Sequence, residues 1–219
     1  MTEPRPTAIV FDLDGTLVDT VAARISAWRE TLAEAGIVTE DGQLRPMIGM
    51  DGRALAREIA RVAGRTLDDG EAERIDRLAG ERFDEHNHSP VPLTGAREVL
   101  DRLDVSGITW AIATSSRAEQ VAASVHALGL PHQPRIVDGS RVAHAKPAPD
   151  LLLLAAHELD VDPARAWYVG DSTWDMRAAS AAGMRPIGVL AGAAVGATDL
   201  REAGAASVIE TLADLWPAG

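Results

Sequence analysis

The sequence of 219 residues contains no cysteine, which excludes disulfides, thiolate zinc sites, iron–sulfur clusters and thiol catalysis. Aromatic residues make up only 4%, so alanine, leucine, valine and isoleucine must fill the hydrophobic core. Positive charge is also scarce, because 21 lysines and arginines stand against 33 aspartates and glutamates and give a net charge of −12. A protein this acidic is a poor general nucleic-acid binder, so we expect no nucleic-acid partner.

Long apolar runs are missing as well. The longest charge-free stretch after the first predicted strand, residues 186–198, is too short and too rich in glycine to span a bilayer. The N-terminal residues lack the basic and then apolar layout of a signal peptide. With 46% hydrophobic and 25% charged residues, we expect a folded, cytoplasmic protein with no membrane partner.

Apolar runs of strand length alternate with helical patterns and predict a mainly parallel sheet. An apolar run with β-branched residues at 7–11 predicts a first, fully buried strand. Further strands are predicted at 108–113, 135–137, 166–169 and 186–190, and helices at 117–128, 147–159 and 174–182. Strands and helices that alternate at this spacing indicate βαβ units, so the predicted fold class is α/β with a doubly wound, Rossmann-like sheet.

A helical insert interrupts this pattern just after the first strand. Apolar residues recur at helical spacing in three stretches, and no strand-like run lies between residues 19 and 90. An insert of ~70 residues is long enough to fold as a small subdomain. We therefore predict an α/β core of residues 1–19 and 90–219 and an all-helical insert of residues 20–89. Within the insert, Trp28 is predicted to pack in the core and Arg24 to lie on the surface.

Two carboxylates follow directly on the first strand and are the first candidate site. Asp12 and Asp14 lie at its carboxyl end, where open α/β sheets place their ligands, and alternate residues of an extended chain point the same way. Two acids this close require a bound cation or a split in their pKa values. Gly15 permits a sharp turn there. An EF-hand is excluded because the glycine comes two positions too early and Ala23 replaces the final glutamate.

Three later segments add polar side chains at the same predicted edge of the sheet. Thr114 and Ser115 end a strand before a helix, which suits either an oxyanion site or an ordinary helix N-cap. Lys146 is predicted to open a helix, an unfavourable place for a cation unless it faces an anion or carboxylates outside the helix. Asp171 ends another strand, and Asp175 lies one helical turn further on. A carboxylate site without histidine or cysteine selects Mg²⁺ over zinc or copper.

Taken in order, the Asp-x-Asp pair, the threonine, the lysine and the Gly-Asp-x-x-x-Asp segment resemble the four motifs of the haloacid dehalogenase superfamily of phosphohydrolases. The resemblance covers essentially the whole chain, and the helical insert sits where the first-type cap of that superfamily sits. It implies that Asp12 attacks phosphorus and becomes an aspartyl-phosphate, and that Asp14 acts as general acid and then general base. It also implies that Thr114 and Lys146 hold the transferring oxygens.

The resemblance further implies a Mg²⁺ ion as cofactor. Its ligands would be the carboxylates of Asp12 and Asp171 and the backbone carbonyl of Asp14, with Asp175 in support. An acid at Asp14 favours phosphoryl chemistry over dehalogenation, because carbon–halogen cleavage needs no leaving-group proton.

The function that the resemblance implies is a Mg²⁺-dependent phosphatase, monomeric or homodimeric, that acts on a small phosphorylated metabolite such as phosphoglycolate or a sugar phosphate. A phosphomutase similar to β-phosphoglucomutase is the alternative, and a non-enzymatic phosphosugar-binding protein is a third. Gly15 and Ser115 are expected to bind substrate. Arg53, at the start of a helix of the insert, either clamps a carboxylate or second anion of the substrate or is solvated. His86 and His88 are interpreted as a polar hinge rather than a metal site.

Overall fold

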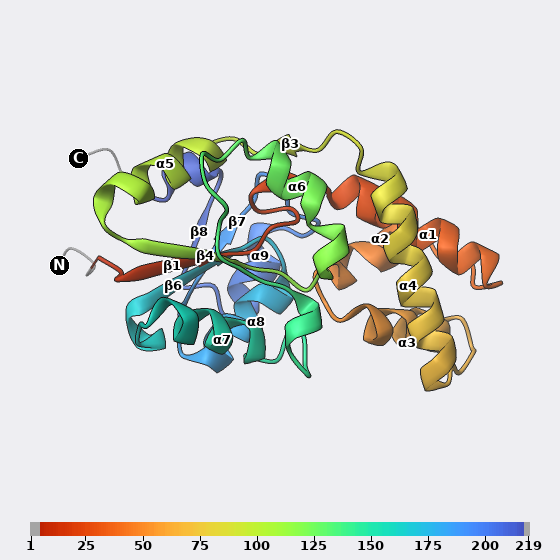
Figure 1. Cartoon of the computed structure of the whole chain (residues 1–219). Helices are drawn as coiled ribbons and strands as arrows, with labels where there is room; N and C mark the ends of the chain where they lie inside the picture. Colours follow the sequence, from red (N-terminus) through yellow and green to blue (C-terminus); the bar gives the residue numbers. More distant parts are fainter. Residues whose placement is uncertain (1–4, 217–219) are drawn as a thin grey trace.

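The computed structural model describes residues 5–216 and contains a six-stranded parallel sheet in the order β5–β4–β1–β6–β7–β8 (Figure 1). The strands are β1 (Ala8–Phe11), β4 (Thr109–Ala113), β5 (Ile136–Val137), β6 (Ala166–Gly170), β7 (Arg185–Val189) and β8 (Ser207–Ile209). Every neighbouring pair in this sheet is parallel, and β1 lies between β4 and β6. The predicted α/β class is therefore confirmed. Residues 1–4 and 217–219 of the predicted core lie outside the described residues.

Helices cover both faces of the sheet because each strand buries side chains on both sides. Ile9 and Phe11 pack in one apolar cluster with residues of α5 (Ala96–Ser106), and α6 (Ala122–Ala127) lies on the same side. Ala8 and Val10, which alternate with them, pack in a second cluster. That cluster includes residues of α7 (Asp150–Leu159) and α8 (Thr173–Ala182), and α9 (Ala197–Glu202) follows β7. The doubly wound arrangement is confirmed.

The segment after the first strand folds into helices with an apolar core of their own. These helices are α1 (Val21–Glu34), α2 (Asp41–Leu44), α3 (Gly52–Val62) and α4 (Asp69–His86), and residues 21–86 are called the helical unit below. Their shared cluster is built on apolar residues at helical spacing, such as Ile25, Leu32, Leu55 and Ile75. Figure 1 shows the helical unit beside the carboxyl ends of the strands.

Two short antiparallel strands join the helical unit to the sheet. β2 (Val18–Asp19) pairs with β3 (Val91–Pro92), so the chain leaves and re-enters the α/β part at one place. The division into a core of residues 1–19 and 90–219 and a separately folding insert of residues 20–89 stays a prediction. Trp28 is 5% exposed and belongs to the apolar cluster of the helical unit, so its predicted place in the core is confirmed.

The predicted helix at 147–159 begins later than expected. α7 starts at Asp150, so the prediction that Lys146 opens a helix is wrong. Pro147 and Pro149 explain the difference, because a proline disfavours the helical conformation at the residue before it. Lys146 therefore lies in an irregular segment that precedes the helix.

The predicted helix at 117–128 is divided into a 3-10 turn, η2 (Ala118–Gln120), and α6. The backbone amide of Gln120 donates to the Arg117 carbonyl three residues earlier, which is the hydrogen bond of a 3-10 turn rather than of an α-helix. Further 3-10 turns are η1 (Arg45–Met47), η3 (Gly139–Arg141), η4 (Pro163–Arg165) and η5 (Leu212–Asp214). Among residues 5–216, no helix is long and apolar enough to cross a membrane.

Candidate active site

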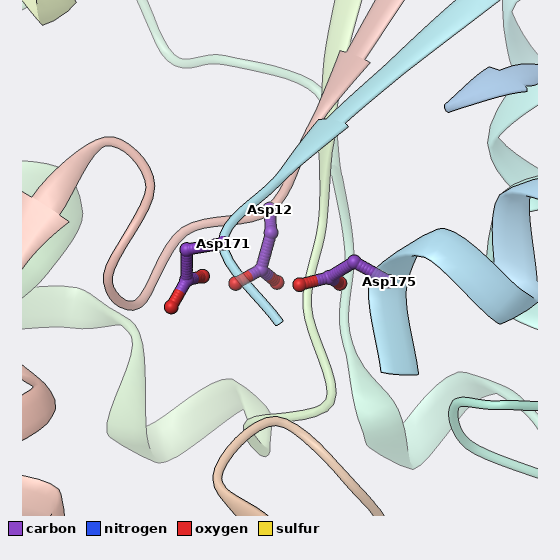
Figure 2. A group of neighbouring side chains, drawn as sticks. All are labelled: Asp12, Asp171 and Asp175. Carbon is purple, nitrogen blue, oxygen red and sulfur yellow. The ribbon is translucent and has the colours of Figure 1, made fainter. Parts of the chain in front are cut away.

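Three aspartates meet at the carboxyl ends of the two central strands. Asp12 follows β1 directly, and Asp171 follows β6, which pairs with β1 in parallel register. Asp175 comes from the first turn of α8. Figure 2 shows the three carboxylates facing one another with Asp12 in the middle, and carboxylate oxygens from all three lie within 4.8 Å of one another. The structure thus brings together the acids that the sequence placed at one edge of the sheet.

A buried lysine bridges two of these aspartates. Lys146 is 1% exposed, and its Nζ donates to Asp12 Oδ1 at 2.5 Å and to Asp175 Oδ1 at 2.8 Å. It also donates to the hydroxyl of Tyr168 at 2.9 Å. Burial opposes the charge of Lys146, but the two carboxylates outweigh it and raise its pKa. The lysine therefore stays protonated and supplies one fixed positive charge beside Asp12.

Burial disfavours the ionised forms of Asp12 and Asp171, and the charge of Lys146 offsets this effect only in part. Burial raises the pKa of Asp12 to about 7, with Lys146 opposing and Asp175 adding to the rise. Burial also raises the pKa of Asp171 well above its ordinary value, and the carboxylates of Asp175 and Asp12 raise it further. A cation held between Asp12 and Asp171 would keep both ionised, and oxygen donors of this kind fit Mg²⁺.

The hydrogen bonds of Asp175 show how it supports the site. Its Oδ1 accepts from Lys146 and from the Tyr168 hydroxyl at 3.0 Å. Its Oδ2 accepts from the Ser172 amide at 3.0 Å and from the Ser172 hydroxyl at 2.6 Å. Because both oxygens already have donors, Asp175 holds Lys146 in place and adds negative charge rather than offering a free oxygen.

Gly15 allows the loop after β1 to pass against Asp171. Its φ is +82°, and a Cβ built on it would lie 2.4 Å from Asp171 Oδ2 and 2.8 Å from Val21 Cγ2. The Gly15 amide donates to the Val18 carbonyl at 2.8 Å. In this structure the residue shapes the loop, and its expected contact with substrate stays a prediction.

Substitution of Gly15 by alanine is expected to destabilise the fold by about 2–4 kcal/mol, because left-handed strain adds to the collision with Asp171. Gly64→Ala is the matched control, since Gly64 has a φ of +76° but nothing within 4 Å of a built Cβ. The control should lose only about 1–2 kcal/mol. Thermal unfolding followed by circular dichroism measures the difference, and equal losses in both variants would show that the approach to Asp171 is not tight.

Asp14 lies two residues after Asp12, beside the three aspartates at the strand ends, and three side chains hold its carboxylate. Its Oδ1 accepts from the Thr20 hydroxyl at 2.8 Å. Its Oδ2 accepts from Arg24 Nη2 at 2.8 Å and from the Ser116 hydroxyl at 2.6 Å. The structure therefore fixes the carboxylate of Asp14 between the core and helix α1.

The prediction that Arg24 lies on the surface is wrong. Its side chain is only 14% exposed, and its guanidinium carbon lies 3.4 Å from the centre of the Phe83 ring. It also donates to Ser116 at 2.8 Å. One helical turn separates Thr20 from Arg24, and this shared face was the available signal, since both side chains reach Asp14.

A cavity of about 510 Å³ lies between the core and the helical unit. The core contributes Asp12, Asp14, Thr114, Ser115 and Lys146 to its wall, in agreement with the predicted grouping. Thr114 is 1% exposed, and its hydroxyl accepts from the Ser116 amide at 3.1 Å. The Ser115 hydroxyl donates to the Gly49 carbonyl at 3.3 Å.

The helical unit supplies the opposite wall of this cavity. Arg53 lies in it together with acidic residues of α4, and its Nη2 donates to Asp51 Oδ2 at 3.1 Å. Trp28 also contacts the cavity from its place in the apolar cluster. Arg117, from the core, reaches across to the same wall and was not singled out from the sequence. No sequence pattern marks it, because its partners lie about 40 residues earlier in the chain.

The histidines near the end of α4 take no part in the cluster. His86 Nε2 lies 3.0 Å from Glu30 Oε2 on α1, an exposed contact between two helices of the helical unit. Within residues 5–216, the aspartate trio is the one group of three or more side chains of metal-ligand type with oxygens, nitrogens or sulfurs this close together. The interpretation of His86 and His88 as a polar hinge stays a prediction.

Comparisons with known proteins show which family the chain belongs to. Residues 9–189 match a family model described as haloacid dehalogenase-like hydrolase. An N-acetylmuramic acid 6-phosphate phosphatase of Pseudomonas aeruginosa is 30% identical over 86% of this chain and 84% of its own length. A phosphoglycolate phosphatase of Xanthomonas campestris pv. campestris is 30% identical over 96% of this chain and 95% of its own. The crystal structure of a hydrolase from Pseudomonas syringae superposes with a TM-score of 0.89 at 32% identity, covering 95% of both chains.

Proposed function

Because the chain belongs to the haloacid dehalogenase-like hydrolase family, we propose that it is a metal-dependent phosphatase that hydrolyses a small phosphorylated metabolite. One observation carries the proposal: the carboxylates of Asp12 and Asp171 lie close together at the strand ends. They lie beside Lys146, and all three residues line the cavity. Relatives named as phosphatases over most of the chain support the same reaction class.

Asp12 is the proposed nucleophile. One of its carboxylate oxygens forms a bond to phosphorus as the bond to the leaving-group oxygen breaks, which gives an aspartyl-phosphate. Asp14 donates a proton to the leaving oxygen and then accepts a proton from the water that hydrolyses the aspartyl-phosphate. The hydrogen bonds from Thr20, Arg24 and Ser116 keep the Asp14 carboxylate beside the cavity for both steps.

Charge explains why a carboxylate can receive a phosphate here. The carboxylates of Asp12 and Asp171 and the backbone carbonyl of Asp14 would hold Mg²⁺, with Asp175 in support. When bound, the ion offsets the negative charge of the nucleophile and of the phosphate. Lys146, together with the hydroxyls of Thr114 and Ser115, binds the phosphate oxygens in this proposal. Acidic residues on the surface repel the phosphate less, because salt screens charges that lie beyond ~8 Å.

The helical unit is proposed to act as a cap over the phosphate site. It supplies one wall of the cavity, and Arg24 ties it to Asp14 and Ser116 of the core. A cap that excludes water around Asp12 strengthens the electrostatic interactions on which the reaction depends. The same wall contacts the part of the substrate that is not phosphate and so sets substrate choice.

A panel of phosphorylated metabolites, assayed for release of inorganic phosphate, tests the proposed function. We expect release from at least one small phosphate ester, with Mg²⁺ present. The phosphomutase alternative has less support, because the two relatives described above, each 30% identical over most of the chain, are named as phosphatases. Formation of an isomeric sugar phosphate in the presence of a bisphosphate primer, without net phosphate release, would favour the mutase instead.

Replacement of Asp14 by asparagine is expected to lower the turnover of an alkyl phosphate by about 10²–10⁴-fold, because the leaving alkoxide then receives no proton. An aryl phosphate with an acidic leaving group, such as p-nitrophenyl phosphate, should be affected less at its first step. Mg²⁺ affinity, measured by calorimetry, should change little, since only the backbone of Asp14 serves the ion. Alkyl phosphate turnover within a few-fold of the unsubstituted enzyme would remove Asp14 from the acid role.

A further inference from the structure

The wall of the cavity opposite the phosphate site carries a dense set of ion pairs, here called the distal cluster: Asp51, Arg53, Glu73, Asp76 and Arg117. Arg117 Nη2 lies 2.7 Å from Glu73 Oε1 and 2.7 Å from Asp76 Oδ2. Arg53 lies 3.1 Å from Asp51 Oδ2 and 3.9 Å from Glu73 Oε2. Three carboxylates thus face two guanidinium groups, and the cluster carries one net negative charge.

Asp76 is held tightly at the inner side of this cluster. A Cβ built on Gly52 would lie 1.8 Å from Asp76 Oδ1, so the small residue at the start of α3 makes room for the carboxylate. Burial raises the pKa of Asp76, Arg117 opposes the rise, and Asp51 and Glu73 add to it. Burial is the main cause of this rise, and the like charges of Asp51 and Glu73 add the smaller part.

Each cation that lines the cavity within residues 5–216 already has a carboxylate partner. Lys146 pairs with Asp12 and Asp175, and Arg24 pairs with Asp14. Arg53 and Arg117 pair with acids of the distal cluster. A substrate carboxylate that entered this wall would have to displace a protein carboxylate from one of these cations, and it would meet a net negative charge.

We propose that the distal cluster selects phosphate esters whose leaving group is rich in hydroxyls and carries no negative charge, such as sugar or polyol phosphates, over phosphorylated carboxylic acids. This inference rests on the proposed phosphatase function. Hydroxyls suit the wall because they donate to the carboxylates of Asp51, Glu73 and Asp76 and accept from the remaining N–H groups of the arginines. Under this proposal Arg53 does not clamp a substrate carboxylate, because its guanidinium pairs with Asp51.

Two matched pairs of compounds test this selection. Glycerol 3-phosphate and 3-phosphoglycerate differ only by a hydroxymethyl group in place of a carboxylate, and so do 2-hydroxyethyl phosphate and phosphoglycolate. We expect kcat/KM to be at least about tenfold higher for the alcohol in each pair, because a like charge placed against the wall disfavours the acid. Equal or higher values for the acids would overturn the inference while leaving the phosphatase function intact.

A variant whose distal cluster has no net charge tests whether this cluster causes the preference for alcohols. Glu73→Gln removes the net negative charge and releases part of Arg117, so the alcohol-to-acid ratio of kcat/KM should fall several-fold. Glu81→Gln is the matched control, because Glu81 lies on the same helix and pairs with Arg77 on the exposed side. An unchanged ratio in Glu73→Gln, or an equal fall in Glu81→Gln, would show that the cluster does not select.

Binding measured without turnover distinguishes failure of this inference from failure of the proposed function. Calorimetry on the Asp12→Asn variant with Mg²⁺ gives dissociation constants for both members of each pair. Tighter binding of the alcohols by about the same factor supports the selection even if no phosphate release is found. Equal or tighter binding of the acids, or binding of neither member, contradicts it.

Discussion

Replacement of Asp12 by asparagine should lower phosphate release by about 10⁴-fold or more, because an amide cannot form the covalent phospho-enzyme and only binding effects remain. The expectation rests on the position of Asp12, which lies between Asp171 and Asp175 and beside the ammonium of Lys146. An acid-quenched reaction of the unsubstituted enzyme should show a phosphate adduct on the peptide that contains Asp12. The variant should show none.

The same substitution should leave the metal-free fold as stable as before, or more stable above neutral pH. Burial raises the pKa of Asp12 to about 7, so its ionised form is disfavoured in the folded state, and asparagine mimics the neutral form. Lys146 keeps Asp175 as a partner at 2.8 Å. Loss of activity without loss of stability distinguishes a functional carboxylate from a structural one.

Asp101→Asn on the exposed side of α5 is the control for this experiment, and it should change neither activity nor stability. Phosphate release by Asp12→Asn within tenfold of the unsubstituted rate would exclude Asp12 as the nucleophile. A large loss of thermal stability at pH 8 in the metal-free variant would instead show that the charge of Asp12 holds the fold together through Lys146.

The acids at the strand ends could be predicted from the sequence because their positions follow from local rules. An apolar strand followed by a polar residue places that residue at the carboxyl edge, and parallel pairing brings such edges together. Asp12, Thr114 and Asp171 follow β1, β4 and β6, which are neighbours in the sheet. Their grouping required no knowledge of distant contacts.

The residues that the sequence did not reveal depend on contacts between the two parts of the chain. Arg24 belongs to an amphipathic helix, and the apolar periodicity of that helix placed Arg24 on its polar face. The spacing of one helical turn between Thr20 and Arg24 becomes informative only when Thr20 is known to reach Asp14. The partners of Arg117 are Glu73 and Asp76, which read as an ordinary charged helix face until the fold places them across the cavity. Lys146 was singled out as a cation at a predicted helix start, and the resemblance implied its role, but the two prolines after it move the start of α7 away from it.

Removal of divalent metal should abolish phosphate release, and added Mg²⁺ should restore it. Without a cation, the raised pKa values of Asp12 and Asp171 leave the nucleophile partly protonated near neutral pH, and in its ionised form it repels a dianionic phosphate. Assays in excess EDTA, followed by titration with Mg²⁺, measure the effect. Full activity in excess EDTA with an aryl phosphate would contradict the metal requirement.

The pH dependence of metal binding follows from the same shift, and its sign can be worked out. The pKa of Asp12 rises from 3.8 to about 7 on folding, so between these values the folded protein binds more protons than the unfolded one. The metal-free protein therefore loses stability as pH rises through this window, and a bound cation that replaces the proton restores it. The rise in melting temperature caused by Mg²⁺ should be larger at pH 8 than at pH 5, and Asp171→Asn should reduce it at both. Equal shifts at the two pH values would show that the ion does not displace protons from these carboxylates and binds elsewhere.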